Sequence, residues 1–231
     1  MSAGDTALLV VDVQEKLLGA IADHRRVAWN IRRLIDGAKI LGLPVAATEQ
    51  YPRGLGPTVP ELAERLASDQ RRVRRGSPDP AETADRQGCR ARRRPSVTPV
   101  ARSGDRPQRG GDRPQRGCRI ASKLSFSCGA CPEIFADWQG RGIHKVLVCG
   151  IEAHVCVQQT VLDLLAAGWR VYLAVDAVGS RFDIDRETAL RRMDSAGATL
   201  TTTEAALFEW CEVAGTPQFK KISRLAKEPA P

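Results

Sequence analysis

The sequence contains no apolar run near the roughly 20 residues that a membrane-spanning helix requires. It also lacks a basic N-terminal segment followed by an apolar stretch, which is the pattern of a secretion signal. We therefore expect a cytoplasmic protein that does not enter a membrane. Seven cysteines in a chain without such a signal favour reduced thiols over a framework of disulfide bonds.

The formal net charge of +8 is unevenly distributed along the chain. Residues 71–119 contain 15 Arg and 5 Asp or Glu, whereas the remaining residues are close to neutral. This arginine-rich segment has six Pro, six Gly and no aromatic residue, and it repeats seven residues in tandem, as Gly104–Gly110 and Gly111–Gly117. Such a composition cannot bury enough apolar surface to offset an ordering entropy of about 1 to 2 kcal/mol per residue. We expect a disordered insert at about 71–119.

Outside the insert, short apolar runs alternate with segments of helical periodicity. We expect strands at 7–11, 44–48, 120–123, 145–149, 171–175 and 198–202, and helices at about 27–41, 60–66, 134–138, 157–165, 186–196 and 204–213. This alternation predicts an α/β fold, a three-layer doubly wound parallel sheet of about six strands with helices on both faces. We expect a single domain over 1–231, interrupted by the insert.

Three reactive side chains lie at the ends of predicted strands. Asp12 follows the first strand, Lys123 ends the third, and Cys156 lies just past the fourth. The carboxyl ends of parallel strands share one edge of a sheet, so the three can converge there. A carboxylate can take the proton of a thiol, and a nearby ammonium stabilises the thiolate that results. Because Cys156 opens a predicted helix, the helix dipole also favours the thiolate, and we expect an ionised sulfur.

Each of these residues also has an ordinary structural interpretation. Cys156 could be a small buried hydrophobe, Asp12 a helix cap, and Lys123 a solvated charge. The pair Cys128 and Cys131 has the spacing of a redox motif, with a packed reduced pair as the favoured alternative.

Four segments taken in order resemble the isochorismatase-like family of cysteine hydrolases. They are Leu9–Gln14, Lys123–Ser127, Gly150–Val157 and Asp176–Arg181. The resemblance covers roughly 5–51 and 120–227 and is strongest to the isochorismatase domain-containing proteins. In the last segment, we expect Asp176, Ser180 and Arg181 to organise the turn after the fifth strand.

The resemblance implies roles for the three reactive residues. Asp12 would be the general base, Lys123 would orient Asp12 and polarise the substrate, and Cys156 would be the nucleophile. Attack on an amide carbonyl would form a thioester that water then hydrolyses. Isochorismate-cleaving members do not need the cysteine, so its retention favours amide-type hydrolysis of a small molecule.

The resemblance also implies the surroundings of the nucleophile. A cis peptide bond would lie at Ile151–Glu152 and turn the backbone N–H groups of Glu152 and Cys156 toward an oxyanion. Gln14, Tyr51 and Phe126 would line the substrate pocket. A homo-oligomer is the family expectation.

Nicotinamidase-like members bind a metal through one Asp and two His placed after the second strand. The corresponding stretch here, Thr48–Arg53, contains no histidine, and His24 and His154 do not fit the spacing. We therefore expect a metal-independent enzyme without a cofactor.

Two other functions remain open from the sequence. The protein could be a catalytically weak or inactive scaffold of the same fold that serves association. Less favoured is nucleic-acid binding through the arginine-rich insert, which lacks the interleaved aromatic residues that stack on bases.

Overall fold

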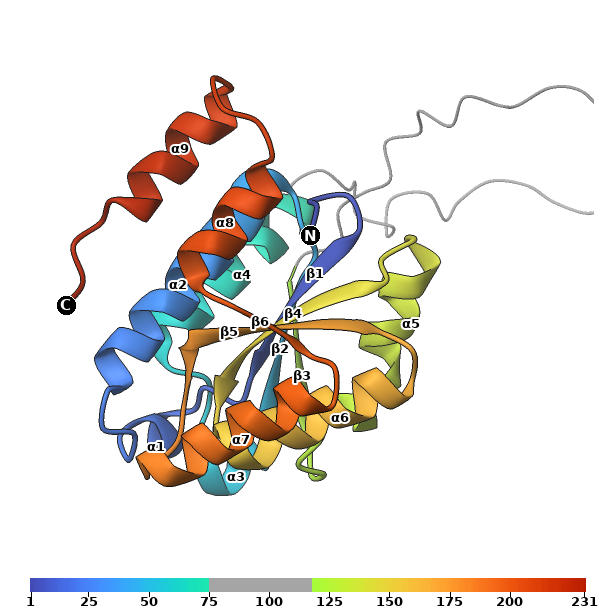
Figure 1. Ribbon diagram of the computed structural model, residues 1–231, viewed down its shortest axis with the longest axis vertical. Coiled ribbons are helices and arrows are strands. Elements are labelled where there is room, and N and C mark those ends of the chain that lie inside the picture. Colours follow the sequence, from blue (N-terminus) through green and yellow to red (C-terminus); the bar gives the residue numbers. More distant parts are fainter. Residues whose placement is uncertain (75–117) are drawn as a thin grey trace, which may run out of the picture.

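The computed structural model describes residues 1–74 and 118–231. Six parallel strands form one sheet in the order β3-β2-β1-β4-β5-β6 (Figure 1). The strands are β1 (Thr6–Val11), β2 (Val45–Gln50), β3 (Arg119–Lys123), β4 (Lys145–Ile151), β5 (Arg170–Gly179) and β6 (Thr199–Thr201). Strands β1 and β4 occupy the centre of the sheet, which explains why both read as continuous apolar runs.

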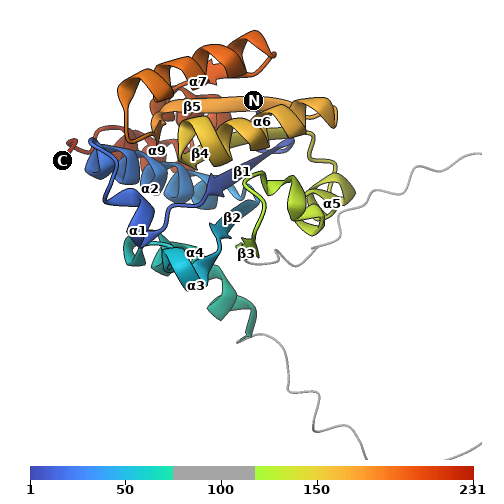
Figure 2. The same cartoon turned by 90° about the horizontal axis from the view of Figure 1, so that it is seen from below.

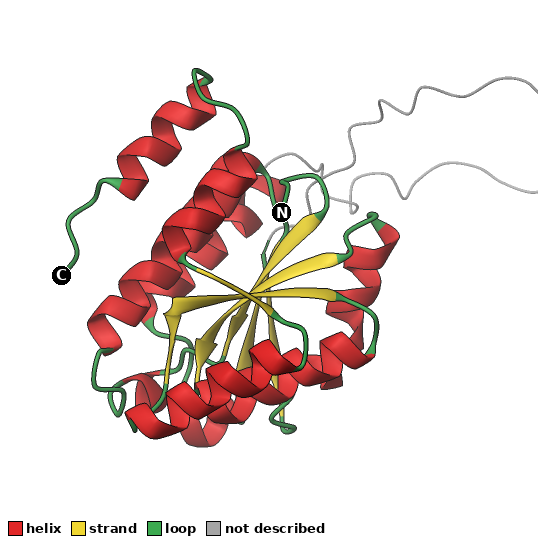
Figure 3. Ribbon diagram, viewed as in Figure 1, coloured by secondary structure: helices red, strands yellow, loops and turns green. Residues whose placement is uncertain are grey.

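Helices cover both faces of the sheet (Figures 1 and 3). The first face carries α2 (His24–Leu41), α4 (Pro60–Arg74), α8 (Thr203–Cys211) and α9 (Pro217–Ala226). The second carries α5 (Pro132–Gly140), α6 (Gln158–Ala166) and α7 (Asp183–Ser195), which Figure 2 shows from below. Four short elements complete the described chain: α1 (Glu15–Leu18), α3 (Pro52–Leu55), the 3₁₀ turn η2 (Cys128–Ala130) and the π-helical turn η3 (Ala153–Val157).

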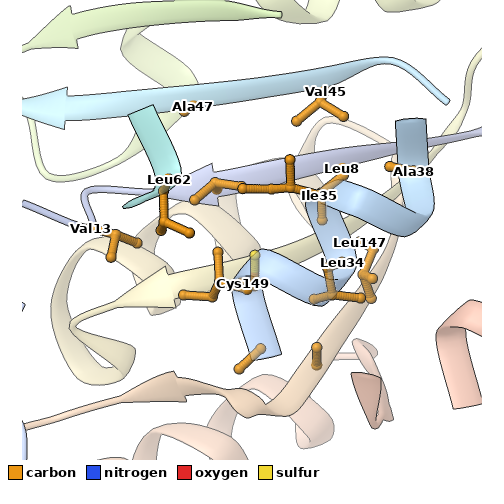
Figure 4. Packing of buried hydrophobic residues seen from close by; sticks show 14 of the residues in the cluster. Leu8, Val13, Leu34, Ile35, Ala38, Val45, Ala47, Leu62, Leu147 and Cys149 are labelled. Atoms are coloured by element: carbon orange, nitrogen blue, oxygen red, sulfur yellow. The ribbon is translucent and has the colours of Figure 1, made fainter. Parts of the chain in front are cut away.

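Alternate residues of β1 supply two separate cores. Leu8 and Val10 pack on the α2 side, and Leu9 and Val11 pack on the α6 side. Figure 4 shows part of the first core, where Leu34 and Ile35 of α2 meet the sheet. Because β1 is completely buried on both faces, its carboxyl end is held rigidly at the centre of the sheet edge.

The structure confirms the predicted fold class and corrects several boundaries. Strand β5 continues to Gly179, so Asp176 lies inside it and not in the following turn. Its carboxylate instead accepts hydrogen bonds from the N–H and hydroxyl groups of Thr203 at the start of α8. Helix α9 was not predicted, although Pro217 at its first position and Thr216 as its cap are ordinary start signals.

Regular elements of the structure extend into both ends of the range predicted for the insert, about 71–119. Helix α4 continues to Arg74 and β3 begins at Arg119. Its interior, including the seven-residue repeat, lies outside the described residues. Within the described parts of the chain, no helix has both the length and the apolar character needed to cross a membrane.

Candidate active site

The carboxyl edge of the sheet brings together the three reactive residues predicted from the sequence. Asp12 directly follows β1 and has a positive φ of 50°, Lys123 ends β3, and Cys156 lies in η3 after β4. All three are buried, with 0, 5 and 5% of their surface exposed, respectively. The Lys123 Nζ atom lies 2.6 Å from Asp12 Oδ2, which makes a buried ion pair. Lys123 and Asp12 therefore lie together at the sheet edge, as the sequence predicted.

The ammonium group of Lys123 is completely surrounded by acceptors. Besides Asp12, it donates to Gln50 Oε1 at 3.0 Å and to the carbonyl oxygens of Phe126 and Ser125 at 2.8 and 3.2 Å. Four acceptors compete for three protons. Lys123 is thus locked in place, and it can act on a bound substrate through its charge without giving up a hydrogen bond.

The carboxylate of Asp12 is held from several sides. Its Oδ1 accepts a hydrogen bond from Thr48 Oγ1 at 2.8 Å, while Oδ2 faces Lys123. The backbone N–H of Asp12 also donates to the carbonyl of Thr48, at 3.2 Å. The carboxylate also lies close enough to the Cys156 thiol to raise the pKa of that thiol. Asp12 is therefore a shared partner of the ammonium and the nucleophile candidate.

The expectation of an ionised sulfur at Cys156 is wrong for the resting site. Burial raises the pKa of the Cys156 thiol, the negative charge and hydrogen bond of Asp12 raise it further, and Lys123 only partly offsets them. The residue also lies in a π-helical turn that precedes α6 and not in the first turn of an α-helix. The raised pKa favours the neutral thiol, so reaction requires a base, and Asp12 is the carboxylate that acts most strongly on this thiol.

The peptide bond Ile151–Glu152 is cis, as the family resemblance implied. The Glu152 side chain is anchored by Arg181, whose Nε lies 2.8 Å from Oε1. His154 Nε2 lies 3.5 Å from Oε2, which accepts no hydrogen bond among the described residues. Ser180 Oγ lies 3.0 Å from His154 Nδ1. Ser180 and Arg181 thus tie the turn after β5 to the cis peptide.

Of the three residues expected to line the substrate pocket, one is fully buried and two are half exposed. Gln14 is fully buried, and its Nε2 donates to the carbonyls of Gln50 and Gly56 at 3.0 and 2.6 Å. Its Oε1 accepts from the Gln50 N–H at 2.7 Å. Gln14 therefore holds the loops together, and its amide is not exposed. Tyr51 and Phe126 are half exposed and lie next to the Lys123 segment, where the backbone N–H of Tyr51 donates to the Lys123 carbonyl.

Sequence reasoning missed three residues that touch this cluster. They are Thr48, Gln50 and Cys128. The first two lie toward the end of strand β2, which pairs with both β1 and β3, so their proximity follows from strand order and not from a local motif. For Cys128, the sequence indicates only its place in a C-x-x-C pair. Cys128 and Cys131 are both reduced and buried.

Over residues 1–74 and 118–231, no three His, Cys, Asp or Glu side chains are grouped so that they could hold a metal ion. His154 instead contacts Ser180 and Glu152, as described above. His24 lies at the start of α2, and its Nδ1 is 3.0 Å from the carbonyl oxygen of Ile21.

Comparison with known proteins shows a match to the family described as Isochorismatase domain over residues 6–205. The human isochorismatase domain-containing protein 2 is 34% identical over 229 residues, covering 99% of this chain and 86% of the human protein. Among solved structures, the MAR1 ribonuclease of Caenorhabditis elegans is 33% identical with a TM-score of 0.74, covering 100% of this chain and 94% of that one. Escherichia coli YcaC, described as an octameric hydrolase of unknown specificity, is 21% identical with a TM-score of 0.71, covering 98 and 90%.

Proposed function

Because the chain belongs to the isochorismatase domain family, we propose that it is a metal-independent cysteine hydrolase of a small amide or related C–N substrate. Cys156 is the nucleophile in this proposal, Asp12 is the general base, and Lys123 orients Asp12. The backbone N–H groups of Glu152 and Cys156 receive the oxyanion. Tyr51 and Phe126 line the entrance for the substrate.

One observation carries the proposal. The buried Asp12 carboxylate forms an ion pair with the Lys123 ammonium and lies close enough to the buried Cys156 thiol to raise its pKa. A scaffold gains nothing from this arrangement, because burying a carboxylate, an ammonium and a thiol together carries a desolvation cost that apolar residues would avoid. The arrangement does suit a thiol that must lose its proton only when a substrate is bound.

The reaction follows from these contacts. Asp12 accepts the thiol proton as Cys156 Sγ attacks the substrate carbonyl carbon, and the carbonyl oxygen becomes an oxyanion. When the tetrahedral intermediate collapses, the C–N bond breaks, and Asp12 returns the proton to the departing amine or ammonia. A thioester remains on Cys156. Water then attacks this thioester with Asp12 again accepting a proton, which passes to Sγ as the carboxylic acid leaves.

The direct test is ammonia or amine release from a panel of small primary and secondary amides. We expect Cys156→Ala to abolish turnover, with a loss of at least about 1,000-fold. Cys211→Ala is the matched control, because Cys211 is a thiol outside the site. Intact-mass analysis of rapidly quenched reactions should show the wild-type chain carrying the acyl group. Turnover by Cys156→Ala at the wild-type rate would refute the mechanism.

A second candidate activity is cleavage of RNA, which is favoured only by the names of structural relatives, among them the C. elegans MAR1 ribonuclease. Incubation of the full chain with single-stranded RNA, with and without the Cys156→Ala change, separates the two candidates. Cleavage that persists in Cys156→Ala would point to chemistry at other residues.

We also propose that the chain self-associates. The support for this is the octameric state stated for YcaC, which shares the fold. Light scattering of the purified full chain should report a mass well above 25.1 kDa.

A further inference from the structure

The hydrogen atoms around Asp12 can be assigned one by one. An ionised carboxylate only accepts hydrogen bonds, so the single hydroxyl proton of Thr48 must point at Asp12 Oδ1, 2.8 Å away. Thr48 Oγ1 also lies 3.3 Å from Cys128 Sγ. With the Thr48 proton already used, the hydrogen in this second contact must come from the thiol of Cys128.

The state of Cys128 agrees with this assignment. Burial raises the pKa of the Cys128 thiol to about 11, with a further contribution from the charge of Asp12, so the group is protonated at neutral pH. Its backbone is fixed as well, because the Cys128 N–H donates to Thr160 Oγ1 at 2.9 Å. The same hydroxyl donates to the Cys156 carbonyl at 2.6 Å. Cys128 is thus fastened to the turn that carries the nucleophile candidate.

We propose that Thr48 is a positioning residue for Asp12, and that Cys128 orients Thr48 through a directed chain of hydrogen bonds, Cys128 Sγ–H to Thr48 Oγ1–H to Asp12 Oδ1. This inference rests on the proposed role of Asp12 as the base. The chain holds Oδ1, while Lys123 holds Oδ2. The carboxylate is thereby fixed in rotation and keeps its lone pairs toward the thiol of Cys156.

The chain also has an electrostatic consequence. A donor that points at a carboxylate stabilises the ionised form, so removal of the donor makes the carboxylate hold a proton more tightly. The titratable groups that interact with Asp12 are Lys123 from β3, Cys156 from η3, Cys128 from η2 and, more weakly, Cys131 at the start of α5. Replacement of Thr48 by Val changes none of these residues, and of their contacts it removes only the hydrogen-bond partner of the Cys128 thiol. The pH dependence of Cys156 reactivity therefore reports the Thr48 hydroxyl.

The measurement uses iodoacetamide as the probe and the full chain. The alkylation rate of Cys156 is followed by peptide mapping between pH 4 and 9, so that Cys156 is read separately from the other thiols. Proton transfer to an ionised Asp12 generates the reactive thiolate, so the rate falls on the acid side as Asp12 becomes protonated. We call this fall in the alkylation rate at low pH the acid limb, and Asp12→Asn should remove it.

We expect Thr48→Val, which is close in shape, to move the acid limb upward by about one pH unit. Thr48→Ser keeps the hydroxyl and should return the limb to within a few tenths of the wild-type position. A purely structural effect of the missing hydroxyl would lower the rate at every pH without moving the limb. An unmoved limb in Thr48→Val, or an equal shift in Thr48→Ser, would overturn the inference.

A second pair of variants keeps the inference testable if Thr48→Val does not fold. Cys128→Ala removes the thiol hydrogen and should shift the limb in the same direction by a smaller amount, whereas Cys128→Ser retains a donor and should shift it less than Cys128→Ala. The opposite order would contradict the chain of hydrogen bonds. Failure of the proposed function looks different, since the wild-type profile would then show no acid limb that depends on Asp12.

Discussion

Replacement of Gly150 by alanine tests how tightly the sheet centre is built around the site. Gly150 lies in β4 directly beside Val11 of β1, with a φ of 123° that L side chains rarely adopt. A Cβ atom there would lie 2.1 Å from the carbonyl oxygen of Val11 and 2.6 Å from its nitrogen. Both contacts are with backbone of a completely buried strand, so no side chain can rotate away to relieve them.

Two separate costs add up in this variant. The unfavourable φ costs about 1 to 2 kcal/mol, and forcing two packed central strands apart costs about 1 to 3 kcal/mol more. We expect Gly150→Ala to lower the free energy of unfolding by about 2 to 5 kcal/mol. Because Asp12 follows Val11 and Cys156 follows β4, the same displacement should also separate the base from the thiol.

The assay is urea denaturation followed by the fluorescence of the buried tryptophans Trp138 and Trp169. Gly197→Ala is the matched control, since Gly197 has a φ of 107° but nothing within 4 Å of the added Cβ. Its free energy of unfolding should fall only by the conformational cost of about 1 to 2 kcal/mol. If Gly150→Ala and Gly197→Ala lower the free energy of unfolding equally, the close approach of β1 and β4 does not restrict position 150, which would refute this explanation.

Two further predictions concern polar groups that hold the fold near the site. Gln14→Met keeps the volume but leaves the Gln50 N–H and two carbonyls without their partner, so we expect a loss of about 2 to 4 kcal/mol by urea denaturation; an unchanged midpoint would show that water replaces the amide. For Asp5, burial raises the pKa, but hydrogen bonds from Lys145, Thr6 and Ser2 outweigh it and hold the pKa well below the ordinary 3.8. The stability from this ionised group is present above that ordinary value and disappears as the pH falls toward the lowered one, so Asp5→Asn should cost about 1 kcal/mol at pH 7 and progressively less below pH 4. A constant difference between pH 7 and pH 2.5 would contradict the role of this ion pair.

Local patterns in the chain were sufficient for the architecture and for placing three candidate residues at one edge of the sheet. The apolar run before Asp12 and the run before Gly150 are buried on both faces in the sheet, and such runs are typical of central parallel strands. Reactive residues at the ends of such strands must lie at one sheet edge, which is why the positions of Asp12, Lys123 and Cys156 in the chain are enough to group them. The end of β5 was predicted too early, because pairing with β4 continues the strand to Gly179.

Contacts between elements far apart in sequence were decided only by the tertiary structure. Thr48 meets Asp12 because β2 lies beside β1, and Cys128 in η2 meets Thr48 in turn. No spacing in the chain encodes these contacts. Helix position alone indicated an ionised Cys156, yet burial and the neighbouring carboxylate reverse this by favouring the neutral thiol. Composition and periodicity are properties of single segments. The burial of a side chain and its hydrogen-bond partners depend on how several segments, distant in sequence, pack around it.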